Sequence, residues 1–116
     1  MKSTGVIGGG SWATAIVKIL SNNIDAFTWW MRNDNQKEHV VEHNHNPKYL
    51  QSVVIDNNIV TATTDIKSII KESDILVIAT PSAFIDETFS KFSKEDFEGK
   101  YIISAVKGII PQTNEI

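Results

Sequence analysis

The apolar positions of the chain alternate between short uninterrupted runs and runs with helical spacing. The first short run, Thr4–Ile7, is β-prone and leads into the glycines at positions 8–10. From Ser11 the spacing changes to i, i+3, i+4, i+7 and i+8, which is typical of one face of a helix. The residues on this predicted face are Trp12, Ala15, Ile16, Ile19 and Leu20. The chain therefore opens with a predicted strand, a glycine loop and an amphipathic helix.

Further short apolar runs predict strands at residues 26–31, 59–63, 75–79 and 101–106. The continuous apolar character of residues 26–31 is expected of a strand that is buried on both faces of a sheet, and residues 75–79 form the clearest buried strand. The segments predicted between the strands are a weak helix over 33–45, a loop over 48–58, a helix capped by Asp65 and a helix capped by Ser82. This alternation predicts an α/β fold with a doubly wound parallel sheet, in one domain over residues 1–116.

The glycine loop has the pattern G-x-G-x-x-A, formed by Gly8, Gly10 and Ala13. Gly8 permits a tight turn out of the strand, Gly10 lets the main chain approach a pyrophosphate, and Ala13 lets the helix pack close to the sheet. The helix that begins near Ser11 directs its N–H groups and positive dipole end at the phosphates. Because the motif lies between a predicted strand and a predicted helix, it indicates a Rossmann-like dinucleotide-binding domain. A plain structural turn without a ligand is the alternative.

The end of the second strand favours NADP over NAD. Proteins that bind NAD usually carry an acidic residue there, about 20 residues after the glycines, for the ribose hydroxyls. This chain has Arg32 and Asn33 instead, and Asp34 comes slightly late. Arg32 can pair with a 2′-phosphate and stack on adenine, and Asn33 can donate to the same phosphate. The alternative for Arg32 is a solvated arginine at a strand end. Either NADP or NAD remains open as cofactor.

Composition narrows the classes of function. A net charge of −3 gives no electrostatic reason to expect nucleic acid or an anionic membrane as partner. The absence of cysteine excludes disulfides, and no apolar run approaches the length of about 20 residues that a membrane span needs. We therefore expect a cytoplasmic protein. His39, His43 and His45 lie in a polar segment without cysteine and are interpreted as a solvated helix face, so no metal is assigned.

Five segments of the chain are informative together. The first is the loop from Gly8 to Ala15, whose aromatic Trp12 is more discriminating than its glycines. The others are Trp30-x-Arg32, residues 46–50 (NPKYL), residues 80–82 (TPS) and residues 104–109 (SAVKGI). In the same order, these segments resemble the N-terminal domain of bacterial NAD(P)-dependent glycerol-3-phosphate dehydrogenases, and the resemblance covers nearly the whole chain.

The resemblance implies further site residues. Ser11 and Trp12 contact the cofactor through the loop, Arg32 and Asn33 take its adenosine end, and Lys107 contacts both cofactor and substrate. The residues implied near the rest of the cofactor are Tyr49, Pro81, Ser82 and Phe84. Three of these residues have an alternative interpretation. Tyr49 is alternatively a residue that packs within a loop, Phe84 a core residue, and Lys107 a solvated lysine in a loop.

The resemblance also implies a reaction. The parent enzyme is expected to interconvert dihydroxyacetone phosphate and sn-glycerol 3-phosphate with NAD(P)H, for phospholipid backbone synthesis. In such enzymes a second, helical domain supplies the catalytic lysine and the homodimer interface. The chain is therefore expected to be truncated before its last strand or strands and this helical domain, to expose a surface meant for that domain, and to be inactive alone. The alternatives are a β-hydroxyacid- or ketopantoate-type dehydrogenase, a noncatalytic dinucleotide-binding module and a nucleotide-free scaffold.

Overall fold

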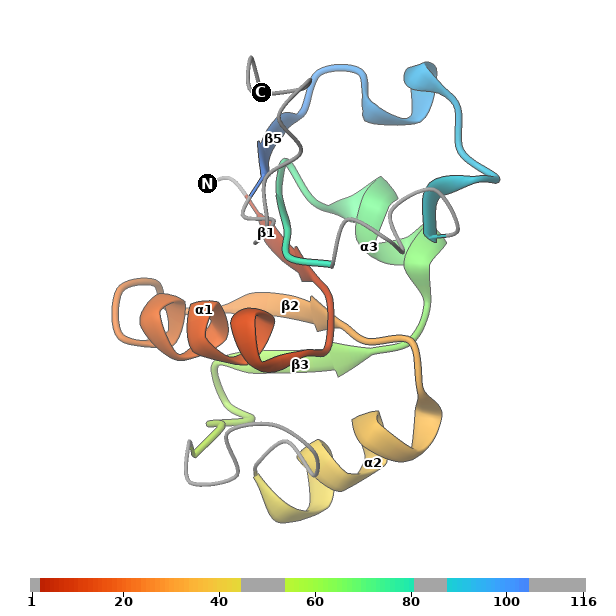
Figure 1. Cartoon of the computed structure of the whole chain (residues 1–116). Helices are drawn as coiled ribbons and strands as arrows, with labels where there is room; N and C mark the ends of the chain where they lie inside the picture. The colour runs from red at the N-terminus through yellow and green to blue at the C-terminus, as the bar shows by residue number, and fades with distance from the viewer. Residues whose placement is uncertain (1–2, 45–53, 81–87, 105–116) are drawn as a thin grey trace.

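Five parallel strands form one sheet in the order β3-β2-β1-β4-β5 (Figure 1). The computed structural model describes residues 3–44, 54–80 and 88–104. The strands are β1 (Thr4–Ile7), β2 (Phe27–Trp30), β3 (Val60–Thr63), β4 (Ile75–Ile78) and β5 (Tyr101–Ser104). Each predicted strand is present, and its predicted bounds agree to within one residue, apart from positions 105–106, which lie outside the described residues. The doubly wound parallel sheet is thus confirmed.

Helices connect the strands. They are α1 (Ser11–Ser21), α2 (Asp34–His43) and α3 (Ile66–Glu72), and a 3₁₀ helix, η1 (Lys94–Phe97), precedes β5. The weak pattern over 33–45 does form a helix, and Asp65 caps α3 by accepting from the Ser68 N–H, as predicted. Residues 88–89 are helical, but Ser82 and the start of the helix predicted there lie outside the described residues. The short η1 was not predicted.

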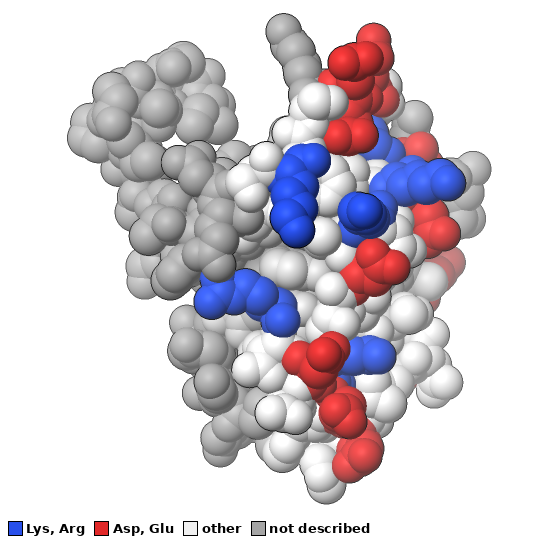
Figure 2. All heavy atoms as spheres, turned by 90° about the vertical axis from the view of Figure 1, so that its right-hand side faces the viewer, with Lys and Arg blue, Asp and Glu red and all other residues white. Residues whose placement is uncertain are grey.

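The side of the molecule that carries α3 and η1 has mixed charge (Figure 2). A hollow of about 480 Å³ there is lined by Lys67, Lys71, Lys91, Lys100, Asp96 and Glu98, together with two apolar residues. Lys100 Nζ donates to the main-chain oxygens of Lys71 and Ser73, at 3.3 and 2.7 Å, so this cation sits at the C-terminal end of α3. A cation at that end of a helix is favoured by the helix dipole. The lining of the hollow shows that basic and acidic groups are interspersed on this face.

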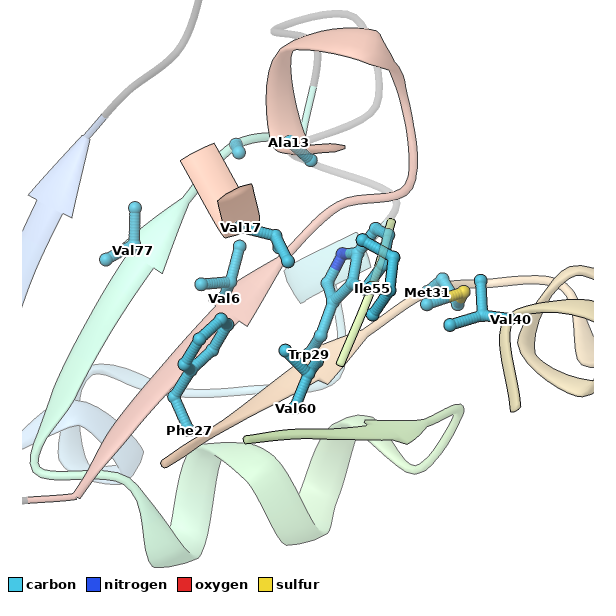
Figure 3. Packing of buried hydrophobic residues seen from close by; sticks show 11 residues of the cluster. Val6, Ala13, Val17, Phe27, Trp29, Met31, Val40, Ile55, Val60 and Val77 are labelled. Atoms are coloured by element: carbon cyan, nitrogen blue, oxygen red, sulfur yellow. The ribbon is translucent and has the colours of Figure 1, made fainter. Parts of the chain in front are cut away.

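Two apolar clusters cover the two faces of the sheet. The first packs α1 and α2 against the sheet around Trp29, which is fully buried (Figure 3). The second packs α3 and the segment before β5 around Trp30. Because successive side chains of a strand point to opposite faces, the adjacent tryptophans of β2 serve one cluster each. This confirms that β2 is buried on both faces.

The predicted buried face of α1 needs correction. Trp12 and Ile19 were expected on the apolar face, but they are 46% and 61% exposed. The residues of α1 in the core are Ala13 and Val17, with Ile16 and Leu20 packed against them in part. The reason is steric: the small side chain of Ala13 lets the helix axis come close to the sheet, and this turns Trp12 outward. Trp12 is then at the surface next to the glycine loop.

The edge strand β5 is exposed. Its apolar residues Tyr101, Ile102 and Ile103 are 62%, 47% and 51% exposed. The apolar run 101–106 predicted this strand, which among the described strands pairs with β4 alone, at the edge of the sheet. Among the described helices, none has the length and apolar character needed to cross a membrane.

Candidate cofactor-binding site

The glycine loop lies at the carboxyl end of β1, where the direction of the strand order reverses. From β1 the chain moves outward to β2 and β3, then crosses to β4 and β5 on the other side. In open parallel sheets, ligands bind in the crevice outside the carboxyl ends of the strands at this reversal. The loop and the first turn of α1 occupy that position in the chain (Figure 1).

Gly8 holds the loop against the neighbouring strands. Its N–H donates to Trp30 O at 3.0 Å, and its φ is 138°. A Cβ at this position would lie 2.7 Å from Ala79 O, just beyond the end of β4. Only glycine combines that backbone conformation with so close an approach to β4. The predicted tight turn at Gly8 is therefore present.

Gly10 is the N-cap of α1. Apart from its two chain neighbours, no described residue has an atom within 4 Å of the Cβ that would be built on it. As a glycine, it has no side chain to accept from the first-turn N–H groups of α1. Ser11 begins the helix, and its side chain lies outside the described residues. The arrangement has room for an anion at the positive end of the helix dipole.

Arg32 and Asn33 follow β2 at the same edge of the sheet, and both are exposed. The Asn33 side-chain oxygen caps α2, accepting from Asn35 N at 2.8 Å and from Gln36 N at 3.2 Å. Asp34 Oδ1 accepts from Thr64 Oγ1 at 2.7 Å, after β3. The Asp34 carboxylate, which comes slightly late in the sequence for a ribose-binding residue, is thus hydrogen-bonded to the residue that follows β3.

A hollow of about 310 Å³ lies beside Arg32. Its lining includes Trp30 from β2, Ile66 and Lys67 from the first turn of α3, and Phe92 from the segment before η1, and further residues are Thr88, Ser90 and Lys91. Its described lining contains three cations and no carboxylate. An anionic group next to Arg32 therefore meets a basic environment.

Five residues implied by the family resemblance fall outside the described residues: Tyr49, Pro81, Ser82, Phe84 and Lys107. Their roles stay predictions. The described part of the site therefore consists of the glycine loop, the start of α1 and the segment after β2.

Three side chains that hold the glycine loop were missed by sequence reasoning. Trp29 Nε1 donates to Gly8 O at 2.6 Å, Gln36 Nε2 donates to Gly9 O at 2.7 Å, and Thr14 Oγ1 donates to Gly10 O at 2.8 Å. One signal in the sequence could have indicated such a contact: Gly9 is a glycine at a variable position of the motif. An extra glycine often marks a place where another group comes close to the main chain.

The described histidines form a pair. The rings of His39 and His43 are 4.5 Å apart, and His43 Nε2 lies 3.8 Å from Glu42 Oε2. Within residues 3–44, 54–80 and 88–104, no group of three or more His, Cys, Asp or Glu side chains could hold a metal ion. His45 lies outside these ranges.

The model of one protein family, described as the N-terminus of NAD-dependent glycerol-3-phosphate dehydrogenase, matches residues 3–116. The glycerol-3-phosphate dehydrogenase [NAD(P)+] of Agathobacter rectalis is 37% identical over 113 residues, which cover 97% of this chain and 33% of that protein. The corresponding protein of a Thermoanaerobacter species is 35% identical over 108 residues, or 93% of this chain and 32% of its own length. The chain thus spans about a third of the length of these curated relatives.

A solved structure shares the fold. Glycerol-3-phosphate dehydrogenase from Saccharomyces cerevisiae superposes with a TM-score of 0.80 at 25% identity, over 92% of this chain and 34% of that one. The similar part is therefore the region that carries the sheet and the glycine loop.

Proposed function

Because the chain belongs to the family of NAD-dependent glycerol-3-phosphate dehydrogenases, through the N-terminal part of that family, we propose that it is the cofactor-binding part of such an enzyme. The proposed reaction interconverts dihydroxyacetone phosphate and sn-glycerol 3-phosphate with NAD(P)H. The names of the relatives support this reaction over that of a β-hydroxyacid- or ketopantoate-type dehydrogenase.

The observation that carries the proposal is the open N-terminus of α1 at the reversal of the strand order. Gly10 offers no side chain there, and a Cβ on it would meet no described atom within 4 Å other than those of its chain neighbours. A pyrophosphate needs such close access to main-chain N–H groups, together with the positive end of a helix dipole. The described residues therefore fit a dinucleotide.

The proposed division of labour follows from general dehydrogenase chemistry. When bound, the nicotinamide ring supplies or accepts the hydride. The residues of this chain are proposed to bind and orient: the loop from Gly8 to Gly10 is assigned to the pyrophosphate, and Trp12, which is exposed beside the loop, is assigned to the cofactor. We assign Lys107 to the phosphorylated three-carbon substrate and the cofactor, since a cation suits both anions. Tyr49, Pro81, Ser82 and Phe84 are assigned to the cofactor by the same family resemblance.

We assign a preference for NADP to Arg32. Its exposed guanidinium stands at the end of β2, beside a hollow whose described lining has three cations and no carboxylate. Asp34, the nearest acidic residue in the sequence, is bonded to Thr64. A 2′-phosphate pairs well with a guanidinium, whereas a ribose hydroxyl usually pairs with a carboxylate.

We further propose a cytoplasmic homodimer for the complete enzyme, with no nucleic-acid partner. The mixed charge of the α3 side supports the last point (Figure 2).

The test is a paired titration of the chain with NADPH and NADH, followed by quenching of tryptophan fluorescence. We expect NADPH to bind more tightly. Arg32→Glu should raise the Kd for NADPH at least tenfold, or ~1.4 kcal/mol, and change the Kd for NADH less than about threefold.

The matched control is Lys67→Glu, which makes the same change of charge in the same hollow, on α3. It should raise the Kd for NADPH much less than Arg32→Glu does. Circular dichroism checks that each variant is folded. A folded chain that binds neither cofactor would contradict the proposed function. Equal loss of both cofactors in Arg32→Glu would contradict only the phosphate role of Arg32.

A further inference from the structure

Gln36 is a buried polar residue in a polar helix. Only Gln36 and Val40 are buried among the residues of α2, and Gln36 is 8% exposed. Glutamine is seldom buried unless its amide group makes hydrogen bonds. Here its Nε2 donates to Gly9 O at 2.7 Å, across 27 positions of the sequence. The burial of Gln36 is therefore explained by the glycine loop.

Gly9 and Gln36 fit each other sterically. A Cβ on Gly9 would lie 2.9 Å from Gln36 Oε1 and 3.2 Å from Met31 Cβ. The absence of a side chain at Gly9 is thus what lets the Gln36 amide reach the loop. This explains why a third glycine stands between Gly8 and Gly10, where the dinucleotide motif accepts any residue.

The bond to Gln36 orients one peptide group of the loop. In a trans peptide the C=O and the following N–H point in opposite directions, and the described residues contain no cis bond. Because Gly9 O points at Gln36, the N–H of Gly10 points away from α2. Gly8 O and Gly10 O are held in the same manner, by Trp29 and Thr14. Side chains from β2, α2 and α1 thus occupy all three glycine carbonyls.

We propose that Gln36 is a positioning residue for the cofactor: it holds the Gly9–Gly10 peptide with its N–H directed at the pyrophosphate. This inference rests on the proposed function, since it presupposes that the loop binds a dinucleotide. Without the Gln36 amide, this peptide can rotate and present its carbonyl oxygen to the phosphates, which repels them. Preorganised N–H donors lose less entropy when an anion binds.

The test replaces the donor but keeps the volume. In Gln36→Met the side chain has nearly the same length and no N–H, and in Gln36→Glu it has the same shape but only accepts at neutral pH. Both variants should raise the Kd for NADPH and for NADH by a similar factor, about tenfold or ~1.4 kcal/mol. The Kd for adenosine 2′-monophosphate, which lacks a pyrophosphate, should change less than about twofold.

The control is Asn35→Met, an exposed amide in the same turn of α2, which should leave all three Kd values unchanged. A spectroscopic measurement separates positioning from stability. On addition of NADPH, the amide resonance of Gly10 should shift strongly in the wild-type chain and weakly in Gln36→Met. Titrations run well below each melting temperature keep the folded fraction constant.

The outcomes are distinguishable. If the wild-type chain binds no cofactor, the proposed function fails. If the wild-type chain binds and Gln36→Met melts lower but keeps both Kd values, Gln36 is only structural and this inference is overturned. If Gln36→Met does not fold, Gln36→Glu decides by the same comparison. Loss of affinity for adenosine 2′-monophosphate as well would also overturn it, because the effect would then lie at the adenosine end.

Discussion

The helices α1 and α2 both begin at the carboxyl edge of the sheet, but their first turns are closed differently. At α1 the cap is Gly10, and the space beside it is clear among the described residues. At α2 the cap is Asn33, whose side-chain oxygen accepts from two main-chain N–H groups. Both helix ends have the same positive dipole end. Among the described residues, no cap side chain bonds to the α1 end, so it is the better place for a ligand anion.

This difference changes how the segment after β2 is understood. From the sequence, Asn33 was a candidate donor to a 2′-phosphate, and this stays a prediction for its amide nitrogen. Its oxygen, however, already belongs to the α2 cap. Arg32, directly before it, then carries most of the proposed recognition of the phosphate. The Asn33 oxygen thus closes the helix, and Arg32 is proposed to contact the phosphate.

The largest effect should come from closing α1 in the way that α2 is closed. Gly10→Asp places a carboxylate at a cap position whose backbone is extended and whose surroundings have room for it. Aspartate is a good N-cap, so stability should rise by a few tenths of a kcal/mol. The same carboxylate repels the pyrophosphate, and binding of NADPH and NADH should weaken about 100-fold, or ~2.7 kcal/mol.

Fluorescence titration measures the expected loss of cofactor affinity, and thermal unfolding of the same samples measures the expected gain in stability. Gly99→Asp is the control for binding, since it adds a carboxylate to open space at a turn before β5, away from the loop; the φ of Gly99, 77°, is unfavourable for a side chain, so the stability of this variant should fall. It should leave cofactor binding unchanged. If Gly10→Asp binds either cofactor as tightly as the wild-type chain does, the α1 terminus is not the pyrophosphate site.

Removing the N-cap of α2 should have a smaller effect, and this effect should be on stability. Asn33→Ala removes the side chain that accepts from Asn35 N and Gln36 N, and loss of such a cap costs about 1 kcal/mol. Urea unfolding should give this decrease, whereas Asn35→Ala, which keeps both cap bonds, should change stability much less. The Kd for NADPH should rise less than about threefold in Asn33→Ala. A tenfold rise with unchanged stability would show that Asn33 acts on the ligand and not as a cap.

The sequence predicted most of the fold because its local signals agree with the tertiary structure. The strands are short apolar runs, and Asp65 has the chemistry of the cap that it forms. The wrongly assigned face of α1 has a physical reason. Ile16 and Leu20 belong equally well to a stripe with Trp12 and Ile19 and to a stripe with Ala13 and Val17. The close approach of the helix to the sheet, which depends on tertiary structure, selects the second stripe.

The site was predicted in part for a similar reason. Gly8 and Gly10 are recognisable because their roles depend on local backbone geometry. Gln36 was missed because a single polar residue in a polar helix has no periodic signal, and its partner is 27 residues away. The assignment of a side chain to a ligand needs the three-dimensional contact, whereas the assignment of a main-chain loop does not.

The smallest effect is expected at the third helix start, which tests whether the contrast between α1 and α2 extends to α3. Asp65 Oδ1 accepts from Ser68 N at 3.1 Å, so α3 is closed by its own sequence, as α2 is. Asp65→Asn keeps a good cap and removes only the attraction between the carboxylate and the helix dipole, which is ~0.5 kcal/mol at low salt. Urea unfolding at low and at high ionic strength should show a decrease of this size that salt removes, because exposed charges are screened. The Kd values for NADPH and NADH should stay the same, since the described lining of the hollow beside Arg32 includes Ile66 and Lys67 but not Asp65. If instead the Kd for NADPH falls in Asp65→Asn, the charge of Asp65 is felt by the 2′-phosphate, and the start of α3 belongs with Arg32 in the recognition of that group.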